Sequence, residues 1–227
     1  MKLVFVMDIM NGLVVLAERG ERQNYRPVAE KSLIVKESDP FKVLEFIKPR
    51  FLYVADLDRI TGKGENTEIL KSISPMVEEM IADCGFRSPE ELEQVNFIPV
   101  LGTETFDITR ISEIDRDCYV SFDFRENLFL DASERFGDFR NAVDFLNSFS
   151  VRGIIVLNIA RVGSGKADFR LLEEFLSLSE HPVYLGGGVS DLRDLEILKD
   201  LGCAGVLLST AVHKKRVALD LIQSGFI

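Results

Sequence analysis

The sequence is poor in the residues that build metal centres and disulfide frameworks. It has three cysteines, two histidines and no tryptophan among 227 residues. Cys84, Cys118 and Cys203 are widely spaced and contain no C-x-x-C pair, which argues against both a disulfide scaffold and a zinc site. Neither histidine, His181 nor His213, has a ligand-like spacing. We therefore expect no metal, no cofactor and a reducing, cytoplasmic location.

Long apolar runs and excess positive charge are also missing. No run approaches the length of about 18 apolar residues that a membrane helix needs, and the apolar start reaches Asp8 too soon for a signal peptide. The chain has 27 Lys and Arg against 37 Asp and Glu, a formal net charge of −10. This charge disfavours nucleic acids and anionic membranes as partners. An anionic ligand must then be held by local groups, such as backbone amides and single basic side chains.

The sequence does contain a repeated alternation of apolar runs and helical patterns. Eight such units follow one another at roughly 25 to 30 residues each, a spacing typical of a (β/α)8 TIM barrel. No linker or low-complexity tract divides residues 1–227, which favours one domain. A doubly wound sheet is the alternative, but its G-x-G-x-x-G motif is missing after the first strand. Strands are expected at 3–7, 51–55, 77–82, 97–101, 118–122, 153–157, 183–185 and 205–208, with helices between them that include one opening at Ser88-Pro89 and one over 106–114.

A glycine-rich stretch near the C-terminus is the most informative segment. Gly186-Gly187-Gly188 follows an apolar run, and Ser190 and Asp191 are candidate helix N-caps. One unit later a second run ends in Ser209-Thr210. Glycine lets backbone amides approach a ligand, helix N-termini favour anions, and TIM barrels commonly bind phosphate after strands seven and eight. We predict a phosphate site made of Gly186, Gly187, Gly188, Ser209 and Thr210, with a simple tight turn as the alternative.

Faint two-fold repetition divides the chain into similar halves. Asp8 ends the first strand and Asp123 ends the fifth, half a barrel apart. The segment 83–88 echoes the glycine stretch, and Leu101-Gly102-Thr103 echoes Leu208-Ser209-Thr210. The repetition predicts two-fold half-barrel pseudo-symmetry and a candidate second anion site formed by Gly85, Arg87, Gly102 and Thr103.

Asp8 and Asp123 are the candidate catalytic residues. Each follows an apolar strand and is therefore expected at the C-terminal face of the barrel, where catalytic groups collect. Two carboxylates in different environments can divide the work of general acid and general base. An Amadori-type rearrangement of an aminoaldose needs both, one to open the sugar ring and one to remove the C2 proton. Alternatively, either carboxylate caps a loop or pairs with a basic side chain.

These motifs resemble the histidine-biosynthesis barrel isomerase family, HisA, whose sister cyclase HisF shares the C-terminal signature. The likeness rests on D-I-M-N-G-L-V-V at 8–15, S-D-P at 38–40, D-L-D at 56–58 with Asn66, V-S-F-D at 120–123 and the stretch 186–213. The family converts phosphoribosylformimino-5-aminoimidazole carboxamide ribotide from aminoaldose to aminoketose without a cofactor. Its substrate carries a phosphate at both ends.

The resemblance also implies roles for single residues. It places Asp8 as base and Asp123 as acid, although the residues alone leave this order open. Ser164 stands where the family has a loop-six hydroxyl and is therefore a third candidate catalytic residue. Substrate contacts are expected at Arg19, Asp56 and Asp168.

Several loops depart from the family pattern. Asp83 and Cys84 stand where the family has glycines in its first phosphate loop, and Val162 replaces an acidic residue in loop six. Three functions therefore stay open: a HisA-type isomerase, a divergent enzyme like the HisA-related proteins of archaea that acts on a different phosphorylated metabolite, or a non-catalytic phosphometabolite-binding protein. HisF-type cyclisation is disfavoured, because nothing in the sequence indicates docking of a glutaminase. Each function implies a small phosphorylated metabolite as partner and leaves the oligomeric state open.

Overall fold

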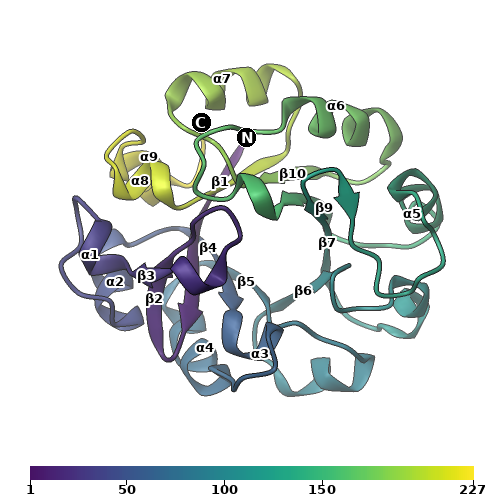
Figure 1. Ribbon diagram of the computed structural model, residues 1–227, viewed down its shortest axis with the longest axis horizontal. Coiled ribbons are helices and arrows are strands. Elements are labelled where there is room, and N and C mark those ends of the chain that lie inside the picture. The colour runs from purple at the N-terminus through teal and green to yellow at the C-terminus, as the bar shows by residue number, and fades with distance from the viewer.

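Eight parallel strands close into a barrel in the computed structural model, which describes residues 1–227 (Figure 1). Each strand pairs with the next barrel strand along the chain, and β11 pairs with β1 from Lys2–Gly205 to Phe5–Leu208. The predicted TIM barrel is confirmed, with strand ends shifted by a few residues. The barrel strands are β1 (Lys2–Met10), β4 (Phe51–Asp56), β5 (Glu79–Asp83), β6 (Ile98–Gly102), β7 (Tyr119–Arg125), β9 (Gly153–Asn158), β10 (Val183–Gly186) and β11 (Gly205–Leu208).

Helices surround the barrel on its outside (Figure 1). The longer ones are α2 (Pro40–Ile47), α4 (Thr67–Ile73), α5 (Phe139–Leu146), α6 (Phe169–Leu178), α7 (Leu192–Asp200) and α9 (Leu219–Ser224). Shorter turns are η1 (Arg22–Asn24), α1 (Val28–Lys31), α3 (Leu57–Ile60), η2 (Ser74–Met76), η5 (Ile159–Arg161) and α8 (Thr210–His213). None of the helices combines the length and the apolar character that a membrane span requires.

Aspartate side chains cap the N-termini of four of the longer helices. Asp39 accepts a hydrogen bond from the Lys42 amide at 3.0 Å, and Pro40 occupies the first turn of α2. Asp138, Asp168 and Asp191 cap α5, α6 and α7 in the same way. These caps satisfy amides that a helix start leaves unpaired, and they explain why the S-D-P motif and Asp191 were readable as helix starts.

Two of the expected α-helices are instead 3-10 helices. The segment opening at Ser88 forms η3 (Pro89–Gln94), where Ser88 makes no side-chain cap and three glutamates crowd six residues. The segment predicted over 106–114 forms η4 (Ile108–Glu113). Asp107 accepts both the Thr109 amide and the Thr109 hydroxyl there. Such local bonds, together with β-branched side chains, disfavour an extended α-helix.

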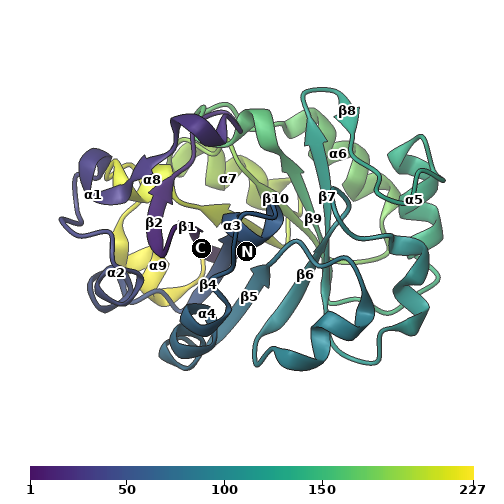
Figure 2. The ribbon, with the colours of Figure 1, turned by 60° about the horizontal axis from the view of Figure 1, so that its bottom comes forward.

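Strands one and five each continue into a hairpin at the same end of the barrel. β1 pairs antiparallel with β2 (Leu13–Leu16), which in turn pairs with β3 (Arg26–Pro27). β7 pairs antiparallel with β8 (Leu128–Phe129). Figure 2 shows β8 and the purple segment after β2 projecting beyond the barrel at this end. The hairpins stand half a barrel apart, in keeping with the predicted half-barrel repetition.

Aromatic rings fill the opposite end of the barrel. Tyr119 and Tyr184 meet edge to face, with ring centroids 5.4 Å apart, and both are buried. Gly205 leaves the space for Tyr184, since a Cβ there would overlap the ring, and Gly153 is tightly bounded by both tyrosines. Buried Val4, Ile81, Val100 and Ile155 complete the interior. The barrel is therefore a packed core below and a pocket above.

Candidate active site at the barrel mouth

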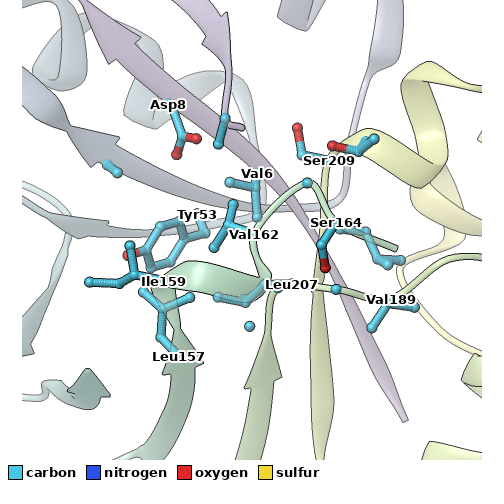
Figure 3. Close-up of a pocket in the computed structure, with 18 of the residues that line it drawn as sticks. Val6, Asp8, Tyr53, Leu157, Ile159, Val162, Ser164, Val189, Leu207 and Ser209 are labelled. Carbon is cyan, nitrogen blue, oxygen red and sulfur yellow. The ribbon is translucent and has the colours of Figure 1, made fainter. Parts of the chain in front are cut away.

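A cavity opens at the carboxyl ends of the barrel strands, the face where TIM barrels place their reactive groups. Figure 3 shows Asp8, Tyr53, Ser164 and Ser209 around this cavity, with apolar side chains between them. The structure thus brings together residues from both ends of the chain. The predicted residues that line it are Asp8, Asp123, Ser164, Gly186, Gly187, Gly188, Ser209 and Thr210.

The glycine loop after β10 has a conformation that needs glycine. Gly187 and Gly188 have φ angles of +87° and +81°, in the left-handed region that other residues rarely adopt. A Cβ on Gly188 would also overlap the carbonyl oxygen of Lys166, which lies in loop six. The amides of Gly188 and Val189 make no hydrogen bond within the chain. They remain available to a ligand in the cavity.

The N-terminus of α7 offers fewer donors than the sequence suggested. Asp191 accepts from the amides of Arg193 and Asp194, and the Asp194 carboxylate accepts from the Ser190 amide at 2.7 Å. Carboxylates of the chain itself therefore occupy the first turn of this helix. An anion in the cavity would be held by the glycine loop rather than by the helix end.

A second group of donors lies beside the glycine loop, after β11. The Thr210 and Ala211 amides make no hydrogen bond within the chain. Ser209 starts α8 without a side-chain cap, so its hydroxyl is not engaged there. Lys214 and Arg216, both exposed, also line this part of the cavity. Amides, a hydroxyl and two cations thus surround one end of the pocket.

Asp8 projects from β1 into the cavity, where its strand begins to pair with β2. Burial raises the pKa of Asp8 from 3.8 to about 7, and the Arg22 guanidinium opposes that shift. Tyr25 and Tyr53 line the same region. Burial raises the pKa of each phenol, and the Asp8 charge adds to both shifts. At neutral pH, Asp8 is therefore protonated in part, and two protonated phenols line the same cavity.

Asp123 is held at the end of β7 by three hydrogen bonds. Its carboxylate accepts from the Ser121 hydroxyl at 2.6 Å and from the Glu104 amide at 3.1 Å, and its own amide donates to the Thr103 hydroxyl at 2.9 Å. Burial and the neighbouring Asp83 carboxylate raise the pKa of Asp123. Its usual ionised form is therefore disfavoured, and the residue is suited to carry a proton.

The candidate second anion site does not assemble. Thr103 is fully buried and bonded to Asp123, and the Gly85 amide donates to Asp83. Arg87 turns to the carbonyl oxygens of Gly85 and Ile60, and none of the four predicted residues lines the cavity. Asp83 and Glu104 line the cavity on the side where this second anion site was predicted. Their carboxylates would repel an anion, which explains why the predicted site does not form there.

The three predicted substrate contacts also lie outside the main cavity. Asp56 is fully buried and accepts from both the amide and the side-chain nitrogen of Asn66 at 2.7 Å. Asp168 caps α6 and accepts from Asn158. Arg19 is exposed on the loop after β2. In the first two, local hydrogen bonds fix the side chain away from the cavity. Ser164 does line it, although its hydroxyl donates to the Arg161 carbonyl at 2.6 Å.

Several residues that line the mouth of the barrel were not identified from the sequence. Arg22 and Tyr25 come from the loop after β2, and Arg22 bonds Glu104 at 3.1 Å across the mouth. Tyr53 points inward from β4, in which it stands among the apolar residues Phe51 to Ala55. A polar ring in an apolar strand was the one signal that could have indicated it. No three His, Cys, Asp or Glu side chains are arranged to hold a metal ion.

Fold and site together define a TIM barrel whose mouth combines a glycine loop with carboxylates from strands one and five. The chain belongs to the histidine biosynthesis protein family, whose model matches residues 2–218. It is 33% identical over 240 residues to an uncharacterized protein of Methanocaldococcus jannaschii, covering 100% of this chain and 99% of that protein.

Relatives with a named activity are more distant. Over 232 residues, and 96% of each chain, the protein is 28% identical to a phosphoribosyl imidazole-4-carboxamide isomerase of Alkaliphilus metalliredigens. Over 236 residues, and 97% of each chain, it is 24% identical to the isomerase of that name in Methanosphaera stadtmanae. Family membership is thus shown over nearly the whole chain, whereas the named activity belongs to those relatives.

Proposed function

We propose that the protein is a cofactor-free acid/base enzyme that isomerises a phosphorylated amino sugar, an aminoaldose-to-aminoketose rearrangement. One observation carries the proposal: two carboxylates with raised pKa values, Asp8 and Asp123, share a cavity with the free amides of the glycine loop. Raised pKa values of this kind concentrate at catalytic sites. A protein that only bound a phosphometabolite would have no use for such a pair.

The phosphate end of the substrate would be held by the glycine loop and the start of α8. Gly188, Val189, Thr210 and Ala211 supply amide donors, and the Ser209 hydroxyl adds another. Lys214 supplies positive charge nearby. Fixing one end of the sugar in this way holds its reactive carbons near the carboxylates, and such positioning lowers the barrier before any proton moves.

The two carboxylates would then divide the proton transfers. Asp123 is the better acid, because burial and Asp83 keep it protonated at neutral pH. It would protonate the ring oxygen, so that the C1–O bond breaks and the nitrogen lone pair forms an iminium ion. Asp8, ionised in part near pH 7, would remove the C2 proton. The C–H electrons form an enaminol, which gains a proton at C1 while its C2 hydroxyl loses one, and the product is the aminoketose.

A second candidate is the same chemistry on a different substrate. The named relatives act on a molecule with two phosphoribosyl groups, whereas here Asp83 and Glu104 line the far side of the cavity. Two carboxylates there would repel a second phosphate. This arrangement favours a metabolite with one phosphate and a neutral or cationic group at its other end.

Single-turnover assays with the histidine-pathway aminoaldose test the proposal. We expect turnover by the wild type and a loss of about 10²-fold or more in Asp8→Asn, the order expected of a general base. The matched control is Asp144→Asn, an exposed residue of α5 with no hydrogen bond. Turnover that survives in Asp8→Asn would overturn the role of Asp8 as the base. If the wild type binds phosphate but does not turn over this substrate, the second candidate replaces the first.

A further inference from the structure

A second hollow lies beside the main cavity, bounded by loop six and the loops after β2 and β7. The side chains that matter in it are Arg19, Glu126, Asn158, Arg161, Ser164 and Lys166. Ser164 lines both hollows, so loop six separates them. We call this second space the outer hollow. Nothing in the proposed reaction uses it.

Positive charge gathers in the outer hollow, although the chain carries a net charge of −10. Arg19 and Lys166 form no ion pair. Arg161 has only a distant one, with its Nε 4.0 Å from Asp168 Oδ2. Glu126 is the single acidic residue in the lining. Three cations in the lining outnumber Glu126 and the adjoining Asp168, which leaves the hollow electrostatically attractive to an anion.

Asn158 adds an unpaired buried acceptor to the lining of the outer hollow. It is 2% exposed, and its Nδ2 donates to the Glu126 carbonyl and to Asp168 Oδ2, each at 3.0 Å. The reverse orientation would set its oxygen against two acceptors, so this one is fixed by the network. Its Oδ1 is buried and has no hydrogen-bond partner. Buried polar atoms rarely lack a hydrogen-bond partner, and an amide oxygen such as this one accepts from a hydroxyl or an N–H donor.

The loop that carries Arg19 is held in place. Arg19 has a φ of +51°, and its amide donates to the Val162 carbonyl at 2.8 Å. Gly163 packs so closely on Ala17 that a Cβ would overlap the Ala17 carbonyl. The backbone on both sides of the outer hollow is therefore already in position, and binding there requires little ordering of the chain.

We propose that the outer hollow is a second anion site, which binds a phosphate ester bearing a hydroxyl group. Arg19, Arg161 and Lys166 hold the phosphate, and Asn158 Oδ1 accepts from the ligand hydroxyl. The site goes beyond the proposed isomerisation and does not depend on it. The ligand is either a separate molecule or the far end of the metabolite in the main cavity.

Calorimetric titration with ribose 5-phosphate tests the site. The wild type is expected to bind two molecules per chain, and Arg161→Gln and Lys166→Gln should each weaken one of the two events about tenfold, the order of a charge-assisted hydrogen bond. Ser209→Ala should weaken the other. The matched control is Arg170→Gln, whose side chain is 92% exposed on α6. Inorganic phosphate should bind the outer hollow more weakly than the sugar phosphate does, because it lacks a hydroxyl on carbon for Asn158.

A sugar bisphosphate separates the two sources of the ligand. One molecule per chain, weakened by Lys166→Gln and by Ser209→Ala alike, would mean that a single metabolite spans both sites. Two molecules per chain, each sensitive to one variant, would mean a separate ligand. If Lys166→Gln and Arg161→Gln behave like Arg170→Gln in every titration, the outer site does not exist. The Asp8→Asn assay is unaffected by any of these results.

Discussion

The Oδ2 atoms of Asp83 and Asp123 converge over Gly102. A Cβ on Gly102 would lie 3.2 Å from the first oxygen and 2.8 Å from the second. Asp83 belongs to β5 and Asp123 to β7, so the two side chains meet across the intervening strand β6. Only glycine leaves room for this meeting. Two buried carboxylates so close together favour a state in which one of them keeps a proton.

Removing the Asp83 charge should therefore lower the pKa of Asp123. Asp83→Asn keeps a similar shape and an oxygen for the Gly85 amide but loses the repulsion that raises the pKa of its neighbour. An acid is active only while protonated, so activity should be lost at lower pH than in the wild type, by roughly one pH unit. The pH–rate profile, or an NMR titration of Asp123, measures the shift. An unmoved pKa would mean that the pair is not coupled.

Asp8 should make the protein less stable at alkaline pH. Its pKa is 3.8 in the unfolded chain and about 7 in the fold, so the native state binds more protons between these values and stability falls as pH rises through them. Asp8→Asn removes this loss. We expect its free energy of unfolding to exceed that of the wild type by about 1 kcal/mol or more at pH 8, with a gain of only about 0.5 kcal/mol at pH 4. Urea denaturation at the two pH values is the measurement, and an equal gain at both would exclude titration as the cause.

Gly188→Ala should disturb the glycine loop more than its strained φ alone can explain. Gly202 is a matched control, because its φ is +86° while nothing lies within 4 Å of an added Cβ. Both variants should lose about 1 kcal/mol of stability from the left-handed backbone. Gly188→Ala should also displace loop six, because its Cβ overlaps the Lys166 carbonyl, and should weaken phosphate binding at least tenfold. Equal phosphate affinities in the two variants would contradict the site.

Asn66 should be essential for stability. Its Nδ2 donates to Asp56 and Asp58, and its Oδ1 accepts from the Gly12 amide at 3.1 Å, which ties the β1–β2 turn to the end of β4. Asn66→Ala leaves two buried carboxylates with fewer donors and should cost about 2–4 kcal/mol. Asn96→Ala, which breaks one exposed hydrogen bond, should cost less than about 1 kcal/mol. Denaturant unfolding compares them, and similar losses would show that the network is dispensable.

The sequence was sufficient for what depends on local pattern. Apolar runs at regular spacing predicted the barrel, and the glycine stretch predicted a tight loop after β10, because strand periodicity and positive φ depend on neighbouring residues. Asp56 and Asp168 were predicted as substrate contacts, but both lie outside the lining of the main cavity. Each is turned aside by a hydrogen bond to a residue at least ten positions away. The meeting of Asp83 with Asp123, and the gathering of cations around Asn158, depend on contacts between strands and loops that no local pattern encodes.

The tyrosine-filled end of the barrel determines from which side a ligand reaches the cavity. Tyr119 and Tyr184 are buried at the amino ends of the strands, so the cavity opens at the carboxyl ends. Under the proposed isomerisation, substrate and product would therefore share one cavity and one opening. The product should then inhibit the reaction competitively with the substrate.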